Sequence, residues 1–178
     1  MYYYLISSLP LLHFAQRPPF SVADYLFSCQ GVLTPEDLSE LKALLQNDKS
    51  RIVSSFGKDW QSWMAVLGNS VLKLRAAGIG LDVRASLLNE EKYSVDLQQG
   101  VSFAFSRDNP LERELALDQL KWAIIEELSV NQSFTVDAVY AYGLELQILE
   151  RWHQMSQKIG ESKLEDLLSS ATNLYSSN

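Results

Sequence analysis

The stretch that decides the fold is residues 135–155, TVDAVYAYGLELQILERWHQM. Its large apolar side chains recur every three or four residues, which is the period of an α-helix, and they occupy two sides of it. One side carries Val136, Tyr140, Leu144, Ile148, Trp152 and Met155, and the other carries Val139, Tyr142, Leu146 and Leu149. A helix that is apolar around most of its circumference is buried on most of its faces. We therefore predict a compact all-α domain built around this segment.

The preceding segment supplies a partner for this helix. Asn109 and Pro110 are typical of a helix start, and the helix that follows should reach about Val130. Thr135 caps the next helix, and the polar connection SVNQSF (residues 129–134) is short enough for an antiparallel hairpin. We expect Gly160 to end the second hairpin helix, and a last amphipathic helix to cover residues 161–174. The predicted fold class is thus an all-α, compact helical bundle around a C-terminal antiparallel helical hairpin.

The first half of the chain predicts three further helices. Ser21 should begin a short helix that ends at Gly31, and Thr34 followed by Pro35 should begin another that reaches Gln46. A third helix is indicated by one continuous stripe of Trp60, Trp63, Met64, Leu67, Val71 and Leu74, which AAGIG (76–80) then stops.

Two regions are ambiguous. Residues 2–9 have β propensity but few strands to pair with. In residues 81–107, VRASLL (83–88) could form a short helix, whereas VSFAFS (101–106) alternates like a strand. We expect residues 1–178 to form a single helical domain, with residues 168–178 as a candidate frayed tail.

Composition excludes several classes of function. The net charge of −7 argues against a nucleic-acid partner, because phosphate binding needs a basic surface. Residues 108–150 hold nine acidic and two basic side chains, whereas residues 42–84 hold seven basic and three acidic ones. Such segments pair with each other within the molecule or, alternatively, form a surface for a charged partner.

The compartment follows from the cysteine count and the hydropathy. The single Cys29 lies in apolar surroundings, which predicts a buried thiol and fits a reducing compartment. No stretch approaches the roughly 18 apolar residues of a membrane span. We therefore expect a soluble cytoplasmic protein that reaches a membrane only through a partner.

Glu150 and His153 form the pattern that most resembles a catalytic motif. A Glu-x-x-His unit on a helix is half of a di-iron site, but the other half needs a second such unit. The only other histidine, His13, follows Pro10 by three residues and has no acid at that position. Known phosphate-binding, nucleophile and zinc motifs are absent from the sequence. We assign no catalytic, cofactor-binding or metal residues, and we expect that the protein is not an enzyme.

Two charged residues lie on apolar helical arcs and require partners. With the turn centred between Gln132 and Ser133, Arg151 lies opposite Glu114, one helical turn from Asp118. We expect Arg151 to bridge to Glu114, Asp118 or both as a structural ion pair. In the rival arrangement Arg151 pairs within its own helix, and Asp118 is satisfied by Arg75 or Arg84.

The N-terminus supplies a candidate interface. Tyr2, Tyr3 and Tyr4 are consecutive, so they cannot all point into the core. Aromatic side chains are enriched at the centres of protein interfaces. These three tyrosines are therefore our candidate interface residues.

Four segments resemble a bacterial family of uncharacterised proteins whose genes lie in operons for the V/A-type ATPase. They are MYYYLISSLP (1–10), GNSVLKLRAAGIG (68–80), NPLERELALDQLKWAIIEEL (109–128) and AYGLELQILERW (141–152), so the likeness covers both ends and part of the middle of the chain. That family is itself loosely similar to the helical C (or d) subunit of the V/A-type ATPase, which lies between the membrane rotor ring and the central stalk. Gln147 departs from the family pattern, which has an apolar residue there.

The resemblance implies a function that composition does not indicate. It implies a non-catalytic accessory, stalk-associated or assembly component of a bacterial V/A-type ATPase, whose partners are other ATPase subunits of the central stalk or rotor ring. Such a protein would be cytoplasmic and peripheral to the inner membrane. The alternatives are an unrelated helical adaptor protein or a carboxylate-ligand metal enzyme. The sequence leaves the oligomeric state open.

Overall fold

The protein is built entirely from helices wherever its structure is described. The computed structural model describes residues 2–82, 87 and 94–175, with side chains as far as residue 158. These residues contain no strand, and they form α1 (Tyr3–Ser8), α2 (Val22–Cys29), α3 (Pro35–Gln46), the short 3-10 helix η1 (Lys49–Arg51), α4 (Ser55–Ala77), α5 (Val95–Phe105), α6 (Pro110–Ser129) and α7 (Val136–Tyr175). The predicted all-α class is confirmed.

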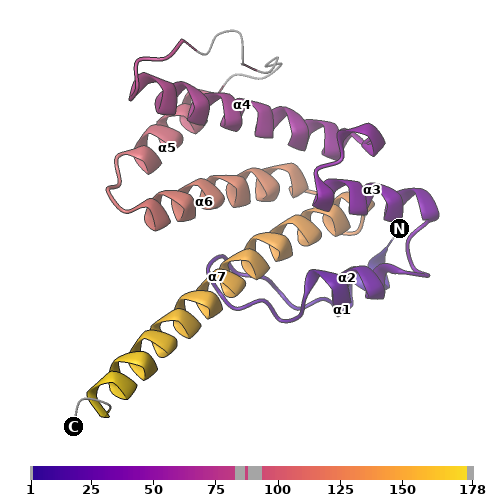
Figure 1. Ribbon diagram of the computed structural model, residues 1–178. Helices are drawn as coiled ribbons and strands as arrows, with labels where there is room; N and C mark the ends of the chain where they lie inside the picture. The colour runs from indigo at the N-terminus through magenta and orange to yellow at the C-terminus, as the bar shows by residue number, and fades with distance from the viewer. Residues whose placement is uncertain (1, 83–86, 88–93, 176–178) are drawn as a thin grey trace.

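The helices form layers around the α6–α7 hairpin. Figure 1 shows α4 lying along α6 with α5 between their ends, and α7 running back beneath α6 in the opposite direction. The N-terminal helices α2 and α3 pack on the first half of α7. The hairpin thus joins an N-terminal layer on one side to α4 and α5 on the other.

The core consists of two apolar clusters that share α6. One cluster combines the N-terminal helices with α7, and α6 adds Trp122 and Ile125 to it. The other combines α4 with α5, and α6 adds Leu117 and Ile124 to it. Because α6 buries apolar side chains on two faces, it is the element that connects the two halves of the molecule.

Several helices begin where the capping residues predict. The Ser21 hydroxyl accepts a hydrogen bond from the Asp24 amide, and the Asp24 carboxylate accepts one from the Ser21 amide in return. Thr34 accepts from the Asp37 amide at 3.1 Å, and Pro35 occupies the first turn of α3. Asn109 caps α6 by accepting from the Leu111 amide at 2.9 Å. These bonds satisfy amides that the first turn of a helix leaves without a backbone partner.

The strand considered for residues 101–106 is wrong, because residues 101–105 belong to helix α5 and Ser106 is its C-cap. Leu97, Val101 and Ala104 are buried at helical spacing, and the Ser94 hydroxyl caps the helix by accepting from the Leu97 amide. The alternating segment VSFAFS therefore lies within a longer helical pattern of buried residues, which begins before it at Leu97. Residues 3–8 also form a helix rather than a strand. The short helix considered for residues 83–88 lies, apart from residue 87, outside the described residues.

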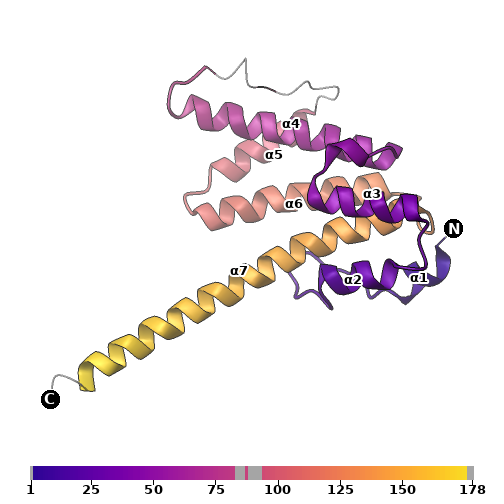
Figure 2. The same ribbon diagram turned by 45° about the vertical axis from the view of Figure 1, so that its right-hand side comes forward.

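The break expected at Gly160 is also wrong. Helix α7 is continuous over 40 residues, from Val136 to Tyr175, so the separate last helix does not exist. A glycine inside a helix costs only about 1 kcal/mol relative to alanine, which good helix formers on either side can offset. Figures 1 and 2 both show the second half of α7 extending away from the other helices. None of the helices in the described part of the chain meets the length and hydropathy of a membrane span.

Helix α7 lies close against the N-terminal layer at Gly143. A Cβ atom added there would lie 3.0 Å from Leu41 Cδ1 and 3.2 Å from Tyr25 Cε1. The missing side chain therefore lets α7 pack against both α2 and α3. Gly68 of α4 offers a control, because a Cβ added there would meet no atom within 4 Å.

We predict that Gly143→Val lowers the free energy of unfolding by about 1–3 kcal/mol, because the added methyl groups force Leu41 and Tyr25 apart. The same change at Gly68 should leave stability almost unaltered. Urea unfolding followed by circular dichroism measures both. Equal effects of the two substitutions would contradict this account of the helix contact.

Candidate functional site

The carboxylate of Asp118 is the most deeply buried acidic group at the centre of the hairpin. The residue is 1 % exposed and lies on α6, at the boundary with α7. Lys121 Nζ, one helical turn along α6, donates to Asp118 Oδ1 at 2.8 Å. Trp152 Nε1 of α7 donates to Asp118 Oδ2 at 2.9 Å, and the Arg151 guanidinium donates to the same oxygen. The buried charge is thus held by two cations and an indole.

The structure brings together the three residues of the expected ion pair. Arg151 Nη2 binds Asp118 and lies 3.9 Å from Glu114 Oε2. Glu114 also lies 3.8 Å from Arg75 Nη2, which connects the basic segment of α4 to the acidic segment of α6. The two oppositely charged segments of the sequence therefore meet within the molecule at this point.

Gln147 is polar where the resemblance predicts an apolar residue, and its side chain has a hydrogen-bond partner in α3. Its side-chain Nε2 donates to the backbone carbonyl oxygen of Leu45 at 2.8 Å, in the last turn of α3. A helix leaves its last carbonyl groups without backbone partners, so a side-chain donor stabilises the end of α3. The polar residue thus fastens α7 to α3.

Removing one partner of a buried ion pair leaves the other charge buried and poorly compensated. We predict that Arg151→Met lowers the free energy of unfolding by about 2–3 kcal/mol, less than for a fully isolated charge because Lys121 and Trp152 remain bound to Asp118. A double-mutant cycle with Asp118→Asn should give a coupling energy above the ~0.2–1 kcal/mol of a surface pair.

The matched control for that cycle is Arg107 with Glu112, a pair at 3.5 Å whose side chains are 37 % and 55 % exposed. Its coupling energy should stay within the surface range. If the two cycles give the same coupling energy, the buried network does not fix the hairpin.

A second pair of acids lies across the hairpin. Burial raises the pKa of the Glu145 carboxyl to about 7, and the charge of Glu126 on α6 adds to the effect. The Glu126 carboxylate accepts a hydrogen bond from Trp122 Nε1 at 2.8 Å. Burial, and to a smaller extent the negative charge of Glu145, raises the pKa of Tyr142 to about 12. Glu145 therefore takes up a proton within the physiological range of pH.

The sign of the resulting pH dependence follows from linkage. Because the pKa of Glu145 is higher in the folded protein than its ordinary 4.5, the folded state binds more protons between these values, and stability falls as pH rises from 4.5 to about 7. We predict that, between about pH 5 and pH 8, the wild type loses about 2–3 kcal/mol more unfolding free energy than Glu145→Gln does.

Chemical unfolding at a series of pH values measures this difference. Glu127→Gln, at an exposed position next to Glu126, is the control and should keep the wild-type pH dependence. If the free energy of unfolding changes with pH in the same way for the wild type and Glu145→Gln, Glu145 does not cause the pH dependence of stability.

Glu150 and His153 line a surface hollow. They line it together with residues 17–21. Glu150 Oε2 accepts a hydrogen bond from the Val22 amide at 3.4 Å, at the start of α2. Within the described part of the chain, no group of three or more His, Cys, Asp or Glu side chains is arranged to hold a metal ion. Cys29 is fully buried, and burial raises the pKa of its thiol.

The three N-terminal tyrosines have different environments. The Tyr2 hydroxyl donates to the Asp37 carboxylate and accepts from the Thr34 amide at 3.3 Å, so this ring fastens the N-terminus to α3. Tyr3 packs against Phe134 with ring centroids 4.9 Å apart. Tyr4 is 88 % exposed. Of the candidate interface residues, Tyr4 is the most available to a partner, and Tyr2 is committed within the molecule.

Other apolar side chains of the same region are exposed as well. Leu11 is 80 % exposed and Phe27 is 73 % exposed. We call Tyr4, Leu11 and Phe27 the N-terminal surface. Residues 2–33 contain only two charged side chains other than histidine, Arg17 and Asp24. The sequence signal that could have indicated this surface is the scarcity of charge, since Leu11 and Phe27 look like ordinary core residues.

Comparison with known protein families gives a match to the C-terminal part of the chain. A protein family described as "Protein of unknown function (DUF2764)" matches residues 95–172, a range that comprises α5, α6 and most of α7. The chain matches no curated protein and no solved structure. The matched range includes Asp118 and Arg151, and the description assigns no activity to it.

Proposed function

We propose that the protein is a non-catalytic accessory, stalk-associated or assembly component of a bacterial V/A-type ATPase and acts by protein–protein contact. Its partners would be other ATPase subunits of the central stalk or rotor ring, which would hold it on the cytoplasmic side of the inner membrane. The likeness of four sequence segments to the family encoded in ATPase operons supplies the ATPase part of this proposal.

The observation that carries the contact role is the N-terminal surface. Tyr4, Leu11 and Phe27 are each more than 70 % exposed, in a segment with very few charges. The centre of a protein interface is depleted in charged residues and enriched in aromatic ones. Large aromatic side chains also supply much of the binding energy at interfaces. This surface therefore has the composition of an interface that lacks its partner.

The shape of the molecule supports the same role. The second half of α7 extends beyond the helical body in both views (Figures 1 and 2). A helix of 40 residues is about 60 Å long at 1.5 Å per residue, so it can reach a second subunit while the body holds the first. An unrelated helical adaptor would share these features, and only the identity of the partner distinguishes the two functions.

We predict that the purified protein forms a stable complex with the stalk and ring subunits of its own organism's V/A-type ATPase. The double variant Tyr4→Glu with Phe27→Glu should lose this complex, because it places two charges in an apolar contact. Its thermal stability should stay close to that of the wild type, since both side chains are exposed. Size-exclusion chromatography of the mixtures measures complex formation.

Phe103→Glu is the matched control, because Phe103 is an aromatic residue that is 64 % exposed on α5, outside the N-terminal surface. It should leave the complex intact. Failure of the wild type to bind at any salt concentration would exclude the ATPase function. If the double variant binds with wild-type affinity, the N-terminal surface is not the contact site, although the proposed ATPase function still holds. Stoichiometric iron, manganese or zinc in the purified protein would instead favour the metal-enzyme alternative.

A further inference from the structure

A groove of about 790 Å³ lies at the turn end of the hairpin, where three segments that are distant in the sequence meet. Its lining comes from Tyr2, from Asp37 in the first turn of α3, and from the hairpin turn and the start of α7. The Tyr2 amide donates to the carbonyl oxygen of Phe134 at 3.2 Å, and the Tyr2 hydroxyl donates to the Asp37 carboxylate. Figures 1 and 2 both show the N-terminal end of the chain beside this turn. The contacts of Tyr2 thus hold the groove together.

Aromatic rings connect this groove to the N-terminal surface. Phe134, which lines the groove, is exposed, and the exposed ring of Tyr3 packs against it. The ring of Tyr4, which belongs to the N-terminal surface, lies with its centroid 5.6 Å from that of Tyr3. The faces of aromatic rings attract lysine and arginine cations. A partner on the N-terminal surface can therefore reach the groove along a continuous row of rings.

Three carboxylates create a negative field on this side of the molecule: those of Asp37 and Glu40 on α3 and of Asp137 on α7. Burial, followed by the charges of these three carboxylates, raises the pKa of Tyr140. Burial and the charge of Glu40 likewise raise the pKa of Asp137. In the part of the chain that the structure describes, none of the three carboxylates pairs with a lysine, arginine or histidine side chain.

A count of the neighbouring charges gives the same sign. Residues 2–8, 34–41 and 126–140, which surround the groove, hold six acidic side chains and no Lys, Arg or His. The next base along α3, Lys42, follows Asp37 by five residues and so lies about 140° further round the helix.

The helix dipoles offset only part of this negative charge. The N-termini of α3 and α7 lie at the groove, and that of α4 lies at Glu40, whose Oε1 accepts from the Ser54 amide at 2.8 Å. Each helix N-terminus contributes about half a positive charge. Three carboxylates exceed the sum of these contributions, so the groove keeps a net negative charge.

We propose that the groove receives a basic segment of the partner protein, with a lysine or arginine side chain between the Phe134 ring and the Asp37 carboxylate. This inference rests on the proposed contact function and adds the chemistry of the partner. A carboxylate has about four acceptor sites, and the Tyr2 hydroxyl uses one of those on Asp37, so a cationic donor can bind the others. The row of rings leading to Tyr4 offers a surface to apolar side chains of the same segment, which favours a protein over a small organic cation.

The test uses the full chain and two peptides that differ only in charge. One is a blocked tetrapeptide of alternating arginine and leucine, and the other carries citrulline, which resembles arginine in shape but is neutral, in place of each arginine. Titration into the isotope-labelled protein at physiological ionic strength, followed by NMR, should shift the amide signals of Phe134, Thr135 and Val136. The arginine peptide should bind at least about fivefold more tightly than the citrulline peptide.

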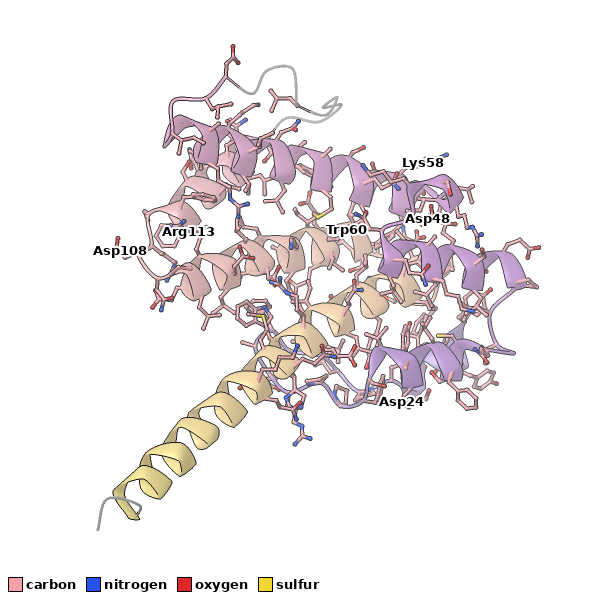
Figure 3. All side chains as sticks on the ribbon, in the orientation of Figure 1. Asp24, Asp48, Lys58, Trp60, Asp108 and Arg113 are labelled. Carbon is pink, nitrogen blue, oxygen red and sulfur yellow. The ribbon has the colours of Figure 1, made fainter. Side chains whose placement is uncertain are left out.

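Substitutions that remove charge without changing side-chain size complete the test. Asp37→Asn should weaken binding of the arginine peptide about fivefold, and Asp137→Asn, which does not line the groove, about twofold. Asp108→Asn is the matched control, because this exposed residue precedes α6 at the opposite end from the hairpin turn (Figure 3). It should leave the affinity unchanged, since salt screens charges at that distance.

Several results would overturn the proposal: no shift of the groove amides, equal affinity for the two peptides, wild-type affinity in Asp37→Asn and Asp137→Asn, or an equal loss in Asp108→Asn. The peptide measurement needs no ATPase subunit. If the subunits bind but the peptides do not, only the basic segment is refuted. If the peptides bind as expected but the subunits do not, only the ATPase function is refuted.

Discussion

The rest of the structure depends on the carboxylate of Asp118. A buried charge is stable only with close partners, and these come from both helices of the hairpin: Lys121 from α6, and Arg151 with Trp152 from α7. Only one register of the hairpin provides all three donors. A shifted register would remove Arg151 and Trp152 from Asp118 and would leave Lys121, which lies on the same helix, as the remaining one of these three partners, so it would destabilise the folded state. The ionic network thus selects the alignment that apolar packing then stabilises.

That alignment has consequences at both ends of the hairpin. It places Gln147 against the end of α3 and Gly143 against α2 and α3, so that the N-terminal layer can pack closely on α7. It also holds Glu145 near Glu126, where burial and like charge keep the carboxyl protonated to a higher pH than usual. The predicted pH dependence of stability therefore results from the register of the hairpin.

The molecule has two surface regions of different chemistry. The N-terminal surface is aromatic and aliphatic, with very few charges nearby, which suits a protein interface. The cleft between α3, α4, α6 and α7 is lined by apolar side chains and by acidic and basic ones. The two surfaces draw on different helices, since the first uses α1, α2 and the segment between them and the second uses α3, α4, α6 and α7.

The sequence by itself determined the helical class, the hairpin and the starts of α2, α3 and α6, because apolar period and capping are local properties of the chain. It also indicated that Arg151 would meet Glu114 or Asp118, since the length of the turn sets the register. Only the tertiary structure decided that residues 101–105 are helical and that α7 continues through Gly160, because neighbouring residues and packing outweigh a short alternating pattern or a single glycine. Only the tertiary structure shows that Tyr4 is exposed whereas Tyr2 is bound within the molecule, that the pKa of Glu145 is raised, and that a cleft lies beside Asp118. The burial of a residue and the charges around it depend on helices that are distant in the sequence.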